Sequence, residues 1–100
     1  MALSAGLGVV PGANIGDDCA VFESVHGSAP DIAGKGLANP LAAIMSAVMM
    51  LNYLGEIEAA ERIKKAYNSV LADNDPRVRT RDIGGTGGTR SFTDAIIARL

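Results

Sequence analysis

The sequence has little that could cross-link it or give it large aromatic side chains: one cysteine, four aromatic residues and no tryptophan among 100 residues. The lone Cys19 cannot form an internal disulfide, which fits a reducing compartment. The apolar residues are mainly aliphatic, which suits helices packed on a sheet. The net charge of −2 is small, so composition predicts neither nucleic acid nor an acidic membrane surface as a partner.

Long hydrophobic runs are also missing. The longest, Leu41–Leu51, is interrupted by Ser46 and is shorter than the roughly 18–20 residues that a bilayer span needs. The first ten residues lack the basic start of a signal peptide. We therefore expect no membrane association and a cytoplasmic location, or the mitochondrial matrix in a eukaryote. The length indicates a single domain whose own core would be marginal.

Local signals predict a mixed α/β chain. Helices are expected near 40–54, 57–72 and 91–99, and short strands near 20–25 and 78–82. Asn39-Pro40 is a typical helix start, and Gly55 is a typical residue just after a helix end. Residues 12–18, which follow the turn signal Pro11-Gly12, are interpreted as a tight polar connection.

The helix expected at 40–54 is apolar nearly all round, so it should be buried on most faces. Its methionines, Met45, Met49 and Met50, are typical of a core and not of a metal or cofactor site. A chain of 100 residues has little other protein to cover such a helix. This mismatch indicates a partner subunit or a missing part of the chain.

The remaining polar patterns are weaker. Alternation over 78–83 places Arg77, Arg79 and Arg81 on one strand face, where they could bind a phosphate but more often form a charged edge. The glycine-rich residues 84–89 lack the Lys-Ser/Thr of a phosphate loop and are interpreted as a tight turn. Ser91 and Asp94 are spaced like a helix capping box.

The segment from His26 to Asn39 carries the richest chemistry. It holds three glycines, one imidazole, one carboxylate and one amide between an apolar strand and the long apolar helix. Small residues let a backbone approach a ligand closely, and a few varied polar groups fix its orientation. This composition is typical of a binding loop.

This segment, His-Gly-Ser-Ala-Pro-Asp-Ile-Ala-Gly-Lys-Gly-Leu-Ala-Asn, resembles the cofactor-binding segment of the β-decarboxylating dehydrogenases. Those enzymes oxidise isocitrate, 3-isopropylmalate or homoisocitrate. Weaker matches follow the same order along almost the whole chain: Val10–Gly16, Ala20–Glu23, Ser46–Leu51, Asp82–Gly85 and Phe92–Ile96. The first two resemble the isocitrate branch more than the isopropylmalate branch. Gly87-Gly88 departs from the family pattern, where less glycine is expected.

The resemblance implies a C-terminal fragment of the isopropylmalate dehydrogenase-like α/β fold, with helices packed on short strands. Residues 1–100 would form a single partial domain, the cofactor-binding part of a larger dehydrogenase. NAD is the implied cofactor, with Asp31 receiving the adenosine ribose hydroxyls and repelling the 2′-phosphate of NADP. His26 and Asn39 would lie at the adenine. The implied cofactor-binding residues are His26, Gly27, Ser28, Ala29, Pro30, Asp31, Ile32, Asn39 and Asp82.

The implied activity is NAD-dependent isocitrate oxidation and decarboxylation, a step of the tricarboxylic acid cycle. The Mg²⁺ or Mn²⁺ ligands, the substrate-binding arginines and the catalytic Tyr and Lys would lie upstream, so no catalytic or metal residue is expected here. The isolated chain should be inactive. We expect a homo-oligomer or a missing N-terminal part, and a small 2-hydroxy acid as substrate of the intact enzyme. The alternatives are a 3-isopropylmalate dehydrogenase fragment and a non-catalytic interaction module.

Overall fold

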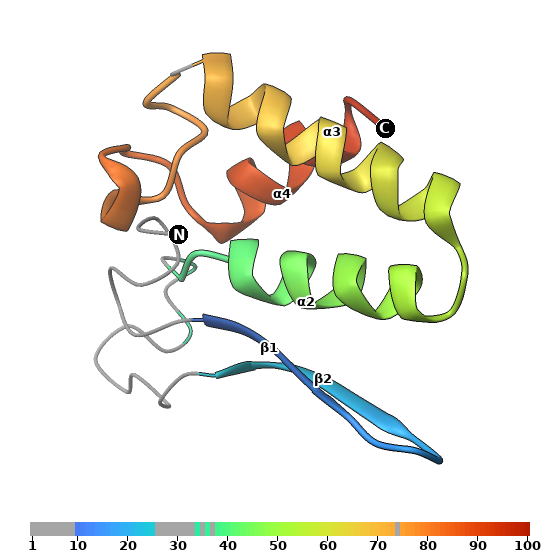
Figure 1. The fold of residues 1–100 in the computed structure, drawn as a ribbon. Coiled ribbons are helices and arrows are strands. Elements are labelled where there is room, and N and C mark those ends of the chain that lie inside the picture. Colours follow the sequence, from blue (N-terminus) through green and yellow to red (C-terminus); the bar gives the residue numbers. More distant parts are fainter. Residues whose placement is uncertain (1–9, 26–33, 35, 37, 74) are drawn as a thin grey trace.

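A computed structural model of the chain describes residues 10–25, 34, 36, 38–73 and 75–100. Within them, two antiparallel strands are followed by three α-helices and one short 3-10 helix (Figure 1). The elements are β1 (Val10–Ile15), β2 (Ala20–Val25), α2 (Leu41–Tyr53), α3 (Ile57–Asp73), η1 (Arg81–Ile83) and α4 (Thr89–Ile97). The prediction of helices packed on short strands is confirmed.

The hairpin is formed by β1 and β2, which pair in register from Val10 with Val25 to Ile15 with Ala20. The strand predicted at 20–25 is confirmed. The turn and polar connection predicted from residue 11 onward are wrong up to Ile15, because Pro11 and Gly12 lie inside β1. Pairing with β2 outweighs their local preference for a turn, and the connection itself is confined to residues 16–19.

Helix α2 lies across the hairpin on one side and beside α3 on the other (Figure 1). The Phe22 ring of β2 meets the Tyr53 ring of α2 with centroids 5.6 Å apart. At the end of α2, Gly55 has φ of 86°, the left-handed conformation expected just after a helix. Both predicted limits of this helix are therefore correct to within a residue.

The core lies between the helices. Its largest fully buried apolar side chains are those of Phe92 from α4 and Val70 from α3, joined by the buried Ile96 and Tyr67. Helix α3 agrees with the prediction for 57–72, since its apolar stripe faces this core. Burial and the negative charge of Glu61 together raise the pKa of the Tyr67 hydroxyl.

The segment predicted as a strand at 78–82 is not one. Its backbone instead closes on itself: the amides of Ile83 and Gly85 both donate to the Thr80 carbonyl, at 3.2 and 3.0 Å. Only an isolated parallel bridge joins Thr80 to Gly87. The turn predicted at 84–89 is confirmed, and the compact loop brings η1 toward the start of α2.

Helix α4 begins two residues earlier than predicted, at Thr89. The capping box assigned to Ser91 and Asp94 is wrong, because Gly88 is the N-cap. The Ser91 hydroxyl accepts from the Gly88 amide at 2.9 Å and donates to its carbonyl at 3.0 Å. A serine in the first turn thus closes back on the glycine before the helix.

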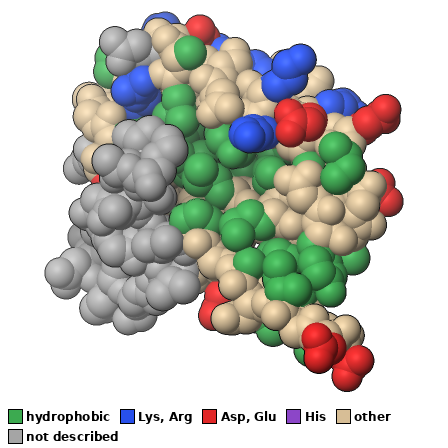
Figure 2. Space-filling model, in the orientation of Figure 1, with side chains coloured by type: hydrophobic (Ala, Val, Ile, Leu, Met, Phe, Trp, Pro, Cys, Tyr) green, Lys and Arg blue, Asp and Glu red, His purple; other side chains and the backbone are tan. Residues whose placement is uncertain are grey.

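Only some of the apolar side chains of α2 are buried in the core. Met45 packs against it, whereas the side chains of Met49 and Met50 are exposed, contrary to the prediction that all three are core. Figure 2 shows hydrophobic side chains reaching the surface between the hairpin and the helices. Further exposed apolar residues are Ile15, Val21, Tyr53, Leu54 and Ile57. No helix in the described residues is long and apolar enough to span a bilayer.

Candidate functional site

The Asn39 side chain lies at the start of α2. Its side-chain Oδ1 accepts a hydrogen bond from the Leu41 amide at 2.9 Å, and the Pro40 carbonyl accepts the Ile44 amide at 3.1 Å. Asparagine followed by proline suits this position, because the amide oxygen satisfies a helix N–H and proline has no N–H to satisfy. Pro40, and not Asn39, is the N-cap residue, so the predicted positions are wrong by one, but the Asn39 side chain does supply the predicted hydrogen bond to a helix amide.

Asp82 lies 43 positions away in sequence but contacts the same side chain. Its Oδ2 accepts a hydrogen bond from Asn39 Nδ2 at 2.9 Å. Its Oδ1 accepts a hydrogen bond from the hydroxyl of Thr80, which is fully buried. Each carboxylate oxygen of Asp82 thus has a protein donor, so the two predicted cofactor residues Asn39 and Asp82 are joined directly.

The end of the loop is also tied to the start of α4. The Thr89 amide donates to the Gly36 carbonyl at 2.8 Å, and its hydroxyl donates to the Ala38 carbonyl. A Cβ added to Gly88 would lie 2.4 Å from the Gly36 carbonyl oxygen. Glycine at position 88 therefore lets the two backbones meet, which gives this departure from the family pattern a structural role.

The polar groups left over at Asn39 suit the edge of an adenine. One hydrogen of its Nδ2 and one lone pair of its Oδ1 are not used by Asp82 and Leu41. An asparagine amide pairs with adenine in this way, donating to N7 and accepting from the N6 amino group. Nearby, Gly34 and Gly36 have φ of 77° and 66°, and an added Cβ would meet no described atom within 4 Å. The Asn39 amide could therefore present one donor and one acceptor to the edge of an adenine base.

The other predicted cofactor residues lie outside the part of the chain that the structure describes. They are His26, Gly27, Ser28, Ala29, Pro30, Asp31 and Ile32. Sequence reasoning missed Thr80 and Thr89, whose hydroxyls hold the site together. Thr80 was missed because the alternating pattern around it predicts a strand. Thr89 was missed because the helix was predicted to begin only at residue 91. In the described ranges no cluster of His, Cys, Asp or Glu could hold a metal ion.

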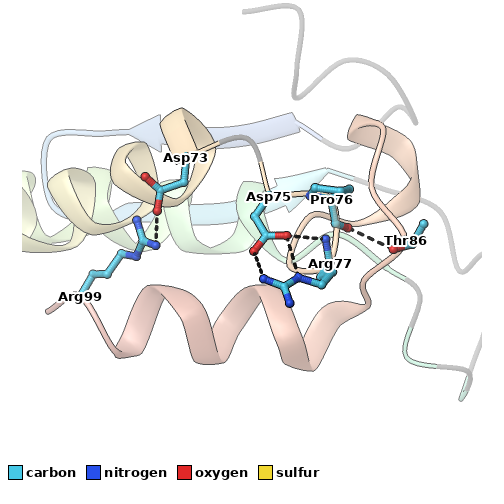
Figure 3. Close-up of polar contacts among 6 residues, drawn as sticks. All are labelled: Asp73, Asp75, Pro76, Arg77, Thr86 and Arg99. Atoms are coloured by element: carbon cyan, nitrogen blue, oxygen red, sulfur yellow. Dashed lines mark hydrogen bonds and ion pairs between the residues drawn. The ribbon is translucent and has the colours of Figure 1, made fainter.

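The arginines of the segment predicted as a strand do not form a phosphate-binding face, because Arg77 and Arg79 contact other residues of the chain. Arg77 is exposed and pairs with Asp75 through Nη2 at 3.0 Å and Nε at 3.2 Å (Figure 3). The hydrogen bonds from the Arg77 side chain and backbone lower the pKa of the Asp75 carboxyl. Arg79 donates to the Leu71 carbonyl. Arg77 and Arg79 therefore contact residues that precede them in the chain, and the prediction of a shared strand face is wrong for them.

Comparison with known proteins gives one consistent result. The family model described as isocitrate/isopropylmalate dehydrogenase matches residues 1–96. The isocitrate/homoisocitrate dehydrogenase of Thermus thermophilus is 60% identical over 98 residues, which are 98% of this chain and 28% of that protein. The mitochondrial NAD isocitrate dehydrogenase subunit 2 of Kluyveromyces lactis is 56% identical over 98% of this chain and 27% of its own. The chain spans little more than a quarter of these relatives.

Solved structures agree on the fold. A β-decarboxylating dehydrogenase from Thermococcus kodakarensis superposes with a TM-score of 0.82 at 45% identity, over 95% of this chain and 27% of that one. The chain thus has the fold of part of a β-decarboxylating dehydrogenase. The chain belongs to the isocitrate/isopropylmalate dehydrogenase family.

Proposed function

We propose that this chain is the NAD-binding part of an isocitrate dehydrogenase. The observation that carries the proposal is the arrangement at Asn39, whose amide has one donor and one acceptor that no described residue uses and that suit an adenine edge. The name of the Kluyveromyces lactis relative, which includes NAD, supports the choice of dinucleotide.

Isocitrate is the favoured substrate of the intact enzyme. Val10–Gly16 and Ala20–Glu23 resemble the isocitrate branch, and both relatives above carry isocitrate in their names. Oxidation would transfer a hydride from the 2-hydroxy carbon to NAD, and a divalent metal would polarise the resulting ketone for decarboxylation. Because the chain spans little more than a quarter of its relatives, we assign these catalytic groups to the remainder of such an enzyme. The exposed apolar face of α2 supports a covering subunit or chain segment.

Nucleotide titration tests the binding assignment. The purified chain, labelled with ¹⁵N, is titrated with NAD while the side-chain amide signals of Asn39 are followed. We expect these signals and those of residues 26–32 to shift with NAD. Signals that stay in place up to millimolar NAD would overturn the binding role.

Catalysis separates the alternatives. We expect no NADH from the chain alone with isocitrate or 3-isopropylmalate and Mn²⁺, and turnover by this measure would contradict the division of roles proposed here. In an intact enzyme that contains the segment, faster turnover of 3-isopropylmalate than of isocitrate would favour the isopropylmalate alternative. NAD binding without oxidation of either substrate in that enzyme would favour a non-catalytic module.

A further inference from the structure

We propose that Asp82 is a positioning residue: it fixes the orientation of the Asn39 amide instead of contacting the nucleotide itself. The inference rests on the proposed function, since it concerns how the NAD-binding segment is held. Both oxygens of the Asp82 carboxylate already have protein donors, Asn39 Nδ2 on one and the Thr80 hydroxyl on the other. One acceptor site on each of its oxygens is therefore occupied by the protein.

The two partners of Asn39 have opposite character. The Leu41 amide is a donor and requires the amide oxygen, whereas the Asp82 carboxylate is an acceptor and requires the amide nitrogen. An amide held in this way cannot exchange its oxygen and nitrogen without losing both bonds. Together with the Leu41 amide, Asp82 thus fixes the direction of the Asn39 donor and acceptor that no described residue uses, and hence the base edge that they match.

The contact between Asp82 and Asn39 is fixed because Asp82 is hydrogen-bonded to a buried residue. Thr80 is fully buried, and its carbonyl also accepts the amides of Ile83 and Gly85. A second connection, from Thr89 to the carbonyls of Gly36 and Ala38, ties the same loop end to α4. The Asn39 side chain is therefore set by the turn at 80–89 as well as by its own helix.

The first arm of the test needs no nucleotide. Asn39→Asp places two carboxylates together, and Asp82→Asn loses either its contact with the Asn39 amide nitrogen or the hydrogen bond donated by the Thr80 hydroxyl. The double exchange restores the bond between positions 39 and 82 with its direction reversed, because Asn at 82 can donate to Asp at 39, and it keeps the bonds donated by the Thr80 hydroxyl and the Leu41 amide. We expect each single variant to lower the melting temperature by about 4 °C or more and the double variant to recover most of the loss. Additive losses would overturn the pairing.

The second arm measures base discrimination. NAD is compared with nicotinamide hypoxanthine dinucleotide, whose 6-position is an acceptor where adenine has an amino donor. In Asp82→Ala we expect the preference for NAD to fall about tenfold while α2 remains helical by circular dichroism. The matched control is Asp94→Ala, an exposed carboxylate on α4, which should keep the preference.

The outcomes separate this inference from the function on which it rests. An unchanged base preference in Asp82→Ala, with NAD still bound, overturns the positioning role alone. Failure of the unmodified chain to bind NAD overturns the proposed function and the nucleotide half of the inference. In that case recovery by the double exchange would still show that the pair holds the start of α2.

Discussion

The Ser46 hydroxyl of α2 accepts a hydrogen bond from the Gly12 amide of β1, 3.4 Å away, and donates to the Ala42 carbonyl at 2.8 Å. Ser46 is buried, so its one polar atom lies at the contact between the helix and the hairpin. Serine in a helix interior commonly bonds back to the preceding turn in this way. Here the same oxygen also satisfies a strand amide 34 positions earlier in the chain.

Replacing Ser46 by Ala should destabilise the fold. The half-buried Gly12 amide would lose its partner, at a cost in the lower part of the about 1–3 kcal/mol known for fully buried groups, while alanine returns up to about 0.5 kcal/mol through its higher helix propensity. We expect a net loss of about 0.5–2 kcal/mol in urea unfolding. Asn52→Ala, exposed on the same helix, is the control. A Ser46 variant as stable as the control would show that the Gly12 contact contributes nothing.

The helices could be predicted because their signals are local. Asn39-Pro40 and Gly55 lie at the ends of α2, and the apolar stripe of α3 repeats with the helical period. Strand β1 could not be predicted, because Pro11 and Gly12 favour a turn and only the pairing with β2 holds them extended. The strand expected at 78–82 failed for the converse reason: its alternation is genuine, but the bonds to the Thr80 carbonyl are not visible in sequence.

The candidate site was predictable in its residues but not in its connections. Asn39 and Asp82 were both assigned to the cofactor, and nothing in a single sequence showed that they touch across 43 positions. The role of Gly88 was equally hidden, because it depends on the backbone of Gly36. Exposure of Met49 and Met50 also escaped prediction, since composition gives the apolar faces of a helix but not the number of neighbours available to cover them.

Gly85 and Gly55 should respond differently to alanine. A Cβ at Gly85 would lie 2.1 Å from the Arg79 carbonyl oxygen and 2.4 Å from its Cβ, so the backbone would have to move. At Gly55 there is open space, and the cost is only the strain of alanine at φ of 86°, about 1–2 kcal/mol. We expect Gly85→Ala to exceed the usual 1–3 kcal/mol or so of overpacking and to cost more than Gly55→Ala. The reverse order in chemical denaturation would contradict the close approach of the two backbones.

The ion pair between Arg77 and Asp75 should be measurable as a pKa change. Hydrogen bonds from Arg77 lower the pKa of the Asp75 carboxyl below its usual 3.8. A lowered pKa means that this carboxylate stabilises the fold above about pH 4 and loses that effect as the pH falls through its folded-state value. Arg77→Gln should raise the pKa of Asp75 in an NMR titration, although the backbone donor remains. A pKa that does not move would mean that the pair is absent in solution.

The choice between NAD and NADP should depend on Asp31, a residue outside the described ranges. We propose that its carboxylate accepts hydrogen bonds from the ribose hydroxyls of NAD, and each charge-assisted bond would contribute about 1.5–3 kcal/mol. The same charge repels the 2′-phosphate of NADP. Since both effects favour NAD, we expect a preference of about a hundredfold or more, each 1.4 kcal/mol being about tenfold.

Substitution of two neighbouring residues tests this preference in an intact enzyme that contains the segment. Asp31→Lys with Ile32→Tyr replaces the carboxylate by a cation that can pair with the 2′-phosphate, so kcat/KM should fall with NAD and rise with NADP. Asp94→Asn, on the exposed face of α4, changes the net charge by one unit and should leave the ratio unchanged. If the double variant kept the original ratio of kcat/KM values, Asp31 would not face the adenosine ribose, and the preference would have to arise elsewhere.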